Sequence, residues 1–388
     1  MSTQAEALLQ PVLPLWEFPV ENSLVVVRPD VAGLFLLNPS ARLLWEELRN
    51  GASLQRAVLR LTEIFGIPES VARRDVEATI AAWQDGLIGE ATPCVLSSSL
   101  PVEASEYCYR ETRDAVRMDC VLQGRSFRVW LEAGEIAEEI GPRLEGIAGT
   151  GEGSAITFRV GRHGDRAGVW LDGVLIADEE KIGGARAILL QEMTRLSAKR
   201  TIRAILHAGA CGTESRCVLL AGASHAGKST LCAALMGGGM TCYADDSAMI
   251  DDRFRVLGMP FPLMLRRSGW DGIGRGAGME EPAWGMRWGV ESGFLASNLP
   301  SGGSPAAPVA GLVFVEYRAN ARRFEMTPLT VFESLMALRE SGFWVEHKRE
   351  SIGESLDWLA GLPRFRMRYA SIDDAVAAVR GLLGFERV

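Results

Sequence analysis

Apolar residues follow two different periods in the first 90 residues of the chain. Residues 24–27 and 34–37 are short runs of Leu, Val and Phe separated by Pro, Asp and Gly, a pattern that predicts an antiparallel β-hairpin. Apolar residues then recur at helical spacing in three stretches that begin near residues 41, 53 and 68, which predicts three helices. Ser53 can cap the second helix, and Pro68 can open the third. The sequence therefore predicts a small α+β module at the N-terminus.

The rest of the chain mixes apolar strand patterns with helical patterns. Strands are expected at residues 127–131, 155–160, 168–171, 217–221 and 311–316. The glycines at 161–164 stand between two of these strands, so they predict a hairpin turn. Composition then divides the chain into residues 1–13 as a tail, 14–92 as the N-terminal module, 93–106 as a linker rich in Ser and Pro, 107–200 as a scaffold subdomain and 201–388 as a catalytic core.

Charge and composition exclude several classes of protein. The net charge of -8 and a pI near 5.3 argue against a non-specific nucleic-acid binder, since phosphate neutralisation needs a basic surface. No apolar run of about 18 residues occurs and the start lacks a signal-peptide pattern, which predicts a cytoplasmic protein without a membrane partner. The seven cysteines are never spaced C-x-x-C and the four histidines are scattered, so neither a disulfide framework nor a zinc knuckle is expected.

Residues 222–229 carry the strongest chemical signal in the chain. They match G-x-x-x-x-G-K-[ST] between an expected strand and an expected helix, where backbone N–H groups and the helix N-terminus can face phosphate oxygens. Lys228 would place its charge between the β- and γ-phosphates, and the Ser229 hydroxyl would bind Mg²⁺. The sequence therefore predicts a site for ATP and Mg²⁺. The residues expected at the nucleotide are Gly222, Ala223, Ser224, His225, Ala226, Gly227, Lys228, Ser229 and Thr230.

Two adjacent carboxylates, Asp245 and Asp246, follow a short apolar strand about 16 residues after this loop. Beside a triphosphate one can hold Mg²⁺ and the other can accept a proton from an attacking hydroxyl. The alternative is an exposed acidic turn that continues into Asp251 and Asp252. Residues 268–308, rich in Gly and Trp, are expected to form either a mobile lid or peptide-contacting loop near the phosphates, or a disordered insertion.

The N-terminal module resembles the PqqD-type peptide chaperones and related recognition elements of ribosomally made, modified peptides (RiPPs). The resemblance rests on LFLLNPSARLLWEELRNGASLQRAV and DVEATIAAWQDGLI and covers about 90 residues. It implies a winged-helix-like fold that holds a leader peptide as an added β-strand beside the hairpin and against the third helix. The alternative is a plain winged-helix domain, but the acidic residues Asp75 and Glu77 on that helix favour peptide over DNA.

The second half resembles the HPr serine kinase/phosphorylase family and its looser relatives through LHAGA, GASHAGKST and ADD. This resemblance implies an α/β P-loop kinase domain, with His207 at an active-site position, Asp245 for Mg²⁺ and Asp246 as the catalytic base, although the two aspartates could exchange roles. Arg266 would contact phosphate. His207 has an alternative as a buried polar residue before a strand. The chain lacks the Pro-Gly-Arg-Asn segment with which the HPr enzymes bind their protein partner, so the substrate is not expected to be HPr.

Together, the two resemblances predict an ATP-dependent kinase that phosphorylates a hydroxyl side chain, most simply serine, of a precursor peptide whose leader binds the N-terminal module. Two alternatives stay open: a kinase for free serine or a similar metabolite, and a nucleotide-gated peptide chaperone without catalysis. The aspartate pair favours an enzyme, since binding alone needs no base. The sequence also leaves a homo-oligomer open.

Overall fold

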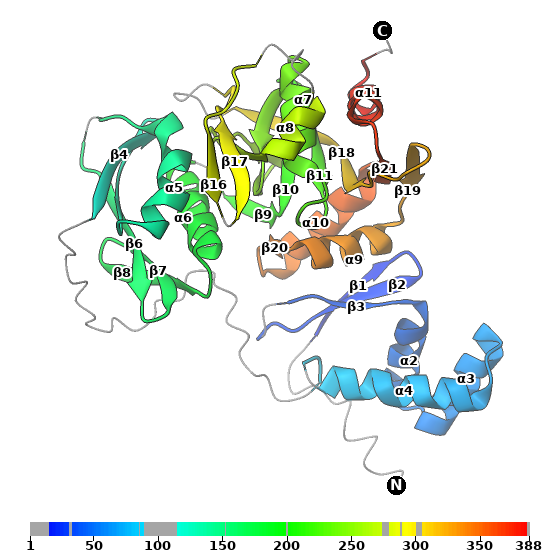
Figure 1. The fold of residues 1–388 in the computed structure, drawn as a ribbon. Helices are drawn as coiled ribbons and strands as arrows, with labels where there is room; N and C mark the ends of the chain where they lie inside the picture. Colours follow the sequence, from blue (N-terminus) through cyan, green and yellow to red (C-terminus); the bar gives the residue numbers. More distant parts are fainter. Residues whose placement is uncertain are drawn as a thin grey trace. The chain divides into compact units, whose positions relative to one another are not determined.

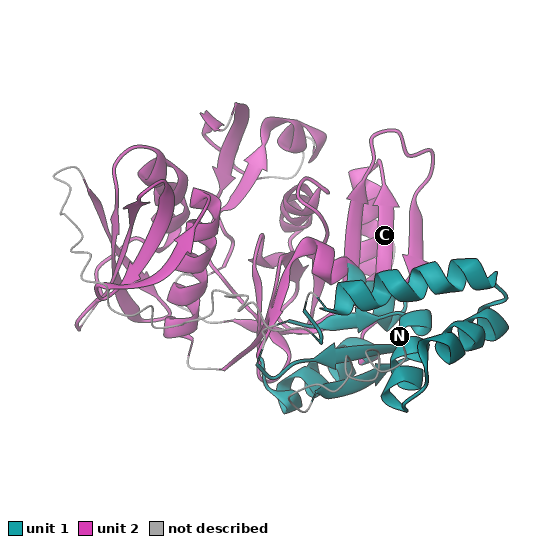
Figure 2. Cartoon of the chain, turned by 90° about the horizontal axis from the view of Figure 1, so that it is seen from below, with its two compact units in different colours: residues 1–98, 330–336, 347–360 teal, residues 99–329, 337–346, 361–388 magenta. Residues whose placement is uncertain are grey.

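The computed structural model describes residues 15–30, 33–84, 86–88, 115–151, 153–198, 201–273, 279–287, 289–299 and 305–385. Two compact units share the chain, and Figure 2 draws them in teal and magenta. Unit 1 comprises residues 1–98, 330–336 and 347–360, and unit 2 holds the remainder. The expected linker at residues 93–106 lies outside the described residues. The catalytic core expected over residues 201–388 thus contributes two segments to the unit that contains the N-terminal module.

Unit 1 begins with an antiparallel sheet in the order β1-β2-β3, coloured blue in Figure 1. The expected hairpin is confirmed as β2 (Ser23–Val27) and β3 (Phe35–Leu37). Sequence reasoning missed β1 (Trp16–Val20), which pairs with β2 along its whole length. Pro19 falls within β1 and cannot donate a backbone hydrogen bond, a defect that an edge strand tolerates.

Three helices follow this sheet, as expected. Asn38 caps α2 (Pro39–Arg49) by accepting from the Ala41 amide at 2.9 Å, and Ser53 caps α3 (Leu54–Phe65) in the same way at 3.3 Å. The third helix, α4 (Glu69–Gln84), begins directly after Pro68. Their inward faces and the sheet share one apolar core, which includes Leu24, Val26, Leu44, Trp45, Val58, Leu61, Val76 and Trp83.

Two segments from late in the chain complete unit 1: the start of α9 (Val331–Ser341) and most of α10 (Arg349–Gly361). The Glu21 carboxylate accepts from the Val331 amide at 3.0 Å, where α9 begins. The ring of Phe18 lies so close to Gly353 on α10 that an added Cβ would stand 3.4 Å from it. The N-terminal module is therefore packed against chain that is more than 300 residues away in sequence.

Unit 2 starts with a five-stranded sheet in chain order, built from β4 (Val116–Leu122), β5 (Arg125–Leu131), β6 (Ile156–His163), β7 (Arg166–Leu171) and β8 (Val174–Glu179). All three strands expected before residue 200 are confirmed, and β6 turns into β7 through Gly164 with a positive φ of 66°. Helices α5 (Glu135–Leu144) and α6 (Ile182–Ser197) pack on this sheet, and a 3-10 turn (Glu145–Ile147) follows α5.

A ten-stranded mixed sheet forms the second part of unit 2 (Figure 1). Its path runs β12-β10-β11-β18-β14-β13-β9-β20, and β21 pairs with both β18 and β19. β11 and β18 are parallel, as are β18 and β21, so their carboxyl ends meet at one edge. The strand bounds are β9 (Ile202–Leu206), β10 (Ala208–Gly212), β11 (Cys217–Ala221), β12 (Thr241–Ala244), β13 (Ala248–Asp251), β14 (Arg255–Leu257), β18 (Ala306–Tyr317), β19 (Glu325–Pro328), β20 (Phe343–Val345) and β21 (Arg364–Tyr369).

Helices α7 (Lys228–Gly237) and α11 (Ile372–Leu382) share the apolar core beside this sheet. The expected strand–loop–helix at residues 217–236 is confirmed as β11, the intervening loop and α7. Among the described helices, none combines the length and apolar character needed to span a bilayer.

The expectation of a disordered insertion over residues 268–308 was wrong for the described part of that segment, and the role of lid or peptide-contacting loop stays a prediction. A short helix, α8 (Arg267–Ile273), is followed by β16 (Trp284–Arg287) and β17 (Val290–Leu295). These two strands form an antiparallel sheet with β15 (Leu263–Arg266) in the order β15-β17-β16. Cross-strand pairing orders the segment despite its glycines, and Gly293 lies where an added Cβ would stand 2.8 Å from Pro282. Residues 274–278, 288 and 300–304 lie outside the described part.

Candidate functional site

The loop at residues 222–229 takes a conformation that demands glycine at two of its positions. Gly222 has φ 143° and Gly227 has φ 97°, values that residues with a side chain rarely adopt. Space is also short, because an added Cβ would lie 2.8 Å from the Val315 carbonyl oxygen at Gly222 and 2.6 Å from the Tyr369 hydroxyl at Gly227. The loop therefore fits closely against the ends of β18 and β21 and leads directly into the first turn of α7.

Lys228 folds back over this loop instead of extending into solvent. Its Nζ donates to the carbonyl oxygens of Gly222 at 2.7 Å and Ala223 at 3.0 Å, and it lies 3.2 Å from His207 Nε2. Burial lowers the pKa of Lys228, although the negative charges of Asp246 and Asp245 oppose the shift. The ammonium is thus held close to both carboxylates and surrounded by carbonyl oxygens that an anionic ligand could replace.

Asp246 is the centre of a chain of charged contacts. One of its oxygens lies 3.3 Å from His207 Nδ1, and the other accepts from Arg186 Nη2 at 3.0 Å. Arg186 also forms a very short hydrogen bond with Glu139 on α5. The other ring nitrogen of His207 contacts Lys228. Five side chains thus connect the scaffold subdomain to the loop, in the order Glu139, Arg186, Asp246, His207 and Lys228.

The electrostatics keep Asp246 ionised. Burial alone would raise its pKa, but the positive charges of His207, Arg186, Arg143 and Lys228 together lower the pKa below its usual value. Burial lowers the pKa of His207, and Lys228 adds to that shift against the opposing effect of Asp246. Asp246 is therefore a carboxylate at neutral pH, able to accept a hydrogen bond from a hydroxyl.

Asp245 has the opposite character, because burial raises its pKa to about 7. Cys232 and Asp246 add to this shift, whereas Arg143 and a hydrogen bond with Ser229 reduce it. Its Oδ2 accepts from the Met264 amide at 3.4 Å, but its buried Oδ1 has no hydrogen-bond partner among the described residues. A buried carboxylate oxygen without a partner is costly unless a cation or a donor is bound to it.

The two residues expected to hold Mg²⁺ fit that ion. Ser229 and Asp245 interact through their side chains and offer a hydroxyl and a carboxylate, hard oxygen donors of the kind that Mg²⁺ prefers. The unpartnered Oδ1 of Asp245 supplies the observation that favours a cation there. When bound, the ion would neutralise phosphate charge, and Ser229 and Asp245 would hold it.

The structure brings most of the expected site residues together. Arg266 is at the end of β15, and its Nη2 lies 3.1 Å from His225 Nε2. The guanidinium group that was expected to contact phosphate therefore lies beside the loop. His225 is exposed, with a positive φ of 68°. Ala223 and Ser224 are exposed as well, whereas Thr230 is half-buried and would touch a Cβ placed on Gly269 of α8. The alternative of an exposed acidic turn was wrong for Asp251, which is fully buried and accepts from Arg255.

Sequence reasoning missed the scaffold residues that support the aspartates. Arg143 and Glu139 on α5 and Arg186 on α6 belong to a region where no chemical motif was visible. Arg143 is 4% exposed, donates to the Pro262 carbonyl oxygen at 3.2 Å, and influences the pKa of both aspartates. One signal was present: Glu139 and Arg143 are charged residues that share helical spacing with apolar residues of the segment that forms α5, where an unpaired charge would be costly.

A second candidate site lies in unit 1, at the sheet β1-β2-β3. Within the described residues β3 pairs with β2 alone, so one edge of the sheet has free backbone groups that an extended peptide could pair with. Helix α2 follows the edge strand β3 in the chain, and its inward-facing residues pack in one core with those of α4.

Residues 23–87 match the family model for Coenzyme PQQ synthesis protein D (PqqD). The chain therefore carries a PqqD-type domain at its N-terminus. PqqD domains belong to the RiPP recognition elements and bind precursor peptides, so the domain indicates recognition of a precursor peptide during RiPP modification. The match covers β2, β3 and the three helices but not β1. A search of curated proteins finds none that matches the chain.

Proposed function

We propose that the chain is an ATP-dependent kinase that phosphorylates a serine hydroxyl of a precursor peptide whose leader binds the PqqD-type domain. One observation carries this proposal: the glycine-dependent 222–229 loop, the folded Lys228 and the aspartate pair converge at one edge of the sheet, where β11 and β12 end. A site for binding alone has no use for an ionised Asp246 that is held by His207 and Arg186. The PqqD-type domain supports a peptide as the acceptor.

The proposed reaction assigns a role to each side chain. Loop N–H groups and Lys228 bind the β- and γ-phosphates, and Ser229 and Asp245 hold the Mg²⁺ that neutralises their charge. Asp246 orients the seryl hydroxyl and accepts its proton as the oxygen bonds to the γ-phosphorus. The bond from that phosphorus to the β,γ-bridging oxygen breaks, and ADP leaves. Arg266, whose Nη2 lies 3.1 Å from His225 on the loop, is assigned to the transferred phosphoryl group.

The Asp246→Asn variant tests the chemical step separately from binding. The amide cannot accept the hydroxyl proton, so we expect Mg-ATP affinity within about threefold of wild type but single-turnover transfer slower by about 10²–10⁴-fold. Asp252→Asn is the matched control, because Asp252 is exposed and directly follows β13, the next strand after Asp246. Transfer by Asp246→Asn at the wild-type rate would remove Asp246 from the proposed role.

The same assay distinguishes the two alternative functions. The acceptor is followed by mass spectrometry with precursor peptide and with free serine. Phosphate on free serine but never on peptide would support a metabolite kinase, and Mg-ATP binding without any transfer would support a nucleotide-gated chaperone. Phosphate on the peptide core, lost in Asp246→Asn, is the outcome that the proposal expects.

A further inference from the structure

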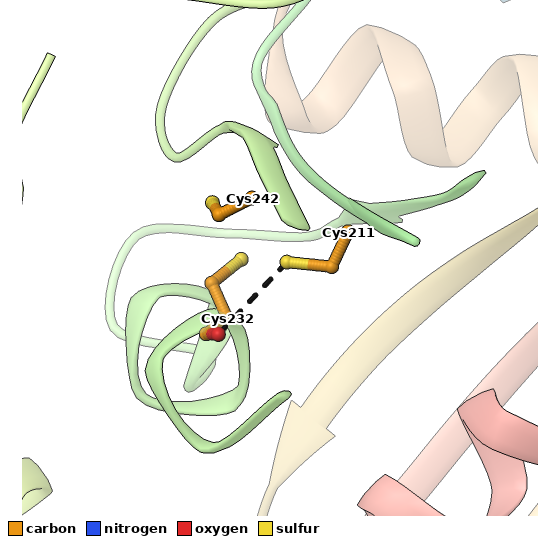
Figure 3. A group of neighbouring side chains, drawn as sticks. All are labelled: Cys211, Cys232 and Cys242. Atoms are coloured by element: carbon orange, nitrogen blue, oxygen red, sulfur yellow. Dashed lines mark hydrogen bonds between the residues drawn. The ribbon is translucent and has the colours of Figure 1, made fainter. Parts of the chain in front are cut away.

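Three buried cysteines converge behind the loop, and the proposed kinase reaction uses none of them. Cys211 on β10, Cys232 on α7 and Cys242 on β12 have their Sγ atoms within 4.8 Å of one another. Figure 3 shows the three side chains approaching from three separate elements. Cys211 and Cys242 are direct cross-strand partners in the pairing of β10 with β12, and α7 places Cys232 against that pair. All three thiols are free and at most 2% exposed.

The spacing of the three sulfurs suits a metal ion. A metal–thiolate bond is about 2.3 Å long, so three sulfurs arranged in a plane around one ion are separated by about 4 Å. Sulfurs that already lie within 4.8 Å of one another need shifts of less than about 1 Å to reach this arrangement. Gly209 provides the space for the Cys232 sulfur. Any residue with a side chain at this position would place its Cβ only 2.5 Å from Cys232 Sγ.

The number and type of ligands decide which ion fits. Structural Zn²⁺ sites are almost always four-coordinate, but within the described chain no other His, Cys, Asp or Glu offers a ligand atom to this group. The thiols share an apolar core cluster with Leu220, Leu231 and Leu235, and a charged group that acts on Cys232 from outside this cluster is Asp245, which the proposed reaction assigns to Mg²⁺. Thiolate ligands without oxygen or nitrogen select soft ions, among which Cu(I) accepts three sulfurs.

We propose that Cys211, Cys232 and Cys242 form a buried three-sulfur site for one soft monovalent metal ion, Cu(I). Each thiol that coordinates as a thiolate releases its proton, and no electron is transferred. An ion bound there would link β10 to α7, which carries Lys228, and to β12, which leads into Asp245. The site is separate from the oxygen ligands expected for Mg²⁺.

The test is an anaerobic titration of the full-length, reduced protein with Cu(I) against a competing chromophoric chelator. Cys94 and Cys108 lie outside the described residues, so both are replaced by serine in every sample. We expect one equivalent of Cu(I) to be withdrawn from the chelator. Loss of a residue that merely supports a ligand costs about 10–100-fold in metal affinity, so Cys232→Ala should weaken binding by at least about 100-fold. Cys217→Ala is the control, because Cys217 is equally buried but outside the group.

X-ray absorption of the copper-loaded protein supplies a second measurement that needs no variant in the group. Three sulfur neighbours at about 2.3 Å support the site. Copper with oxygen or nitrogen neighbours, no stoichiometric binding, equal affinity in Cys232→Ala and Cys217→Ala, or tighter binding of Zn(II) than of Cu(I) would each overturn the proposal. Loss of ATP-dependent transfer in the Asp246→Asn variant bears on the kinase proposal alone.

Discussion

Individual residues at the candidate site depend on partners that are distant in sequence. The two aspartates are adjacent, yet burial raises the pKa of Asp245 to about 7 while surrounding cations lower that of Asp246. The motif at residues 222–229 and the acid pair were visible in the sequence because their spacing is local. Arg186 was not, because its contact with Asp246 spans 60 positions and only the folded sheet brings them together.

Lys228→Ala should weaken Mg-ATP binding by about tenfold to a hundredfold. The substitution removes a charge-assisted contact with phosphate, which contributes about 1.5–3 kcal/mol. Isothermal titration calorimetry measures the effect, and Lys181→Ala is the matched control because Lys181 is an exposed lysine at the start of another helix. Equal affinity in wild type and Lys228→Ala would contradict the assignment of the loop to phosphate.

Asp245→Asn should change the pH dependence of stability in the absence of nucleotide and metal. The folded pKa of Asp245 is raised to about 7 from an ordinary value of 3.8, so between these values the folded state binds more protons than the unfolded state. The free energy of unfolding therefore falls as pH rises through this window, and the loss is complete above about pH 7. The Asp245→Asn variant has no carboxyl group at this position, so its free energy of unfolding does not fall for this reason.

Denaturant unfolding at about pH 5 and about pH 8 measures this effect. The difference in unfolding free energy between Asp245→Asn and wild type should become more favourable to the variant at the higher pH. Asp252→Asn, a substitution at an exposed position, is the control. A difference that is the same at both pH values would mean that Asp245 is already ionised in the folded protein at pH 5.

Elements were predictable where their signals are local. The cap of α3 was predicted at Ser53, because it contacts an amide only three residues away. The strand β1 was missed because its stability comes from pairing with β2, and its sequence carries a proline. Likewise, β16 and β17 lie in a glycine-rich segment whose composition predicts a loop, and only their pairing makes them strands.

Glu21→Ala should loosen the start of α9. Glu21 Oε1 accepts from the Val331 amide at 3.0 Å, and a carboxylate at a helix N-terminus contributes about 0.5–1 kcal/mol at an exposed position. Hydrogen exchange of the Val331 and Phe332 amides should become faster by about two- to fivefold, while exchange in α11 stays unchanged. Glu77→Ala, at an exposed position on α4, is the control. Unchanged exchange at Val331 would show that Thr330 and Glu333, which also cap this helix, hold it without Glu21.

At the scale of the whole molecule, the PqqD-type domain and the candidate kinase site belong to one chain, so leader binding should raise the local concentration of the core peptide. Cutting the chain near residue 93 is a poor test, because Phe18 and Glu21 would lose their partners at Gly353 and Val331. The substrate is shortened instead: with the intact protein, core peptide without its leader should be phosphorylated about 10²–10⁴-fold less efficiently, measured as kcat/KM. Leader supplied as a separate peptide should not restore this rate, since it brings no core with it, and should inhibit modification of the full precursor by occupying the domain. Equal kcat/KM for the core with and without its leader would show that the PqqD-type domain does not guide the reaction.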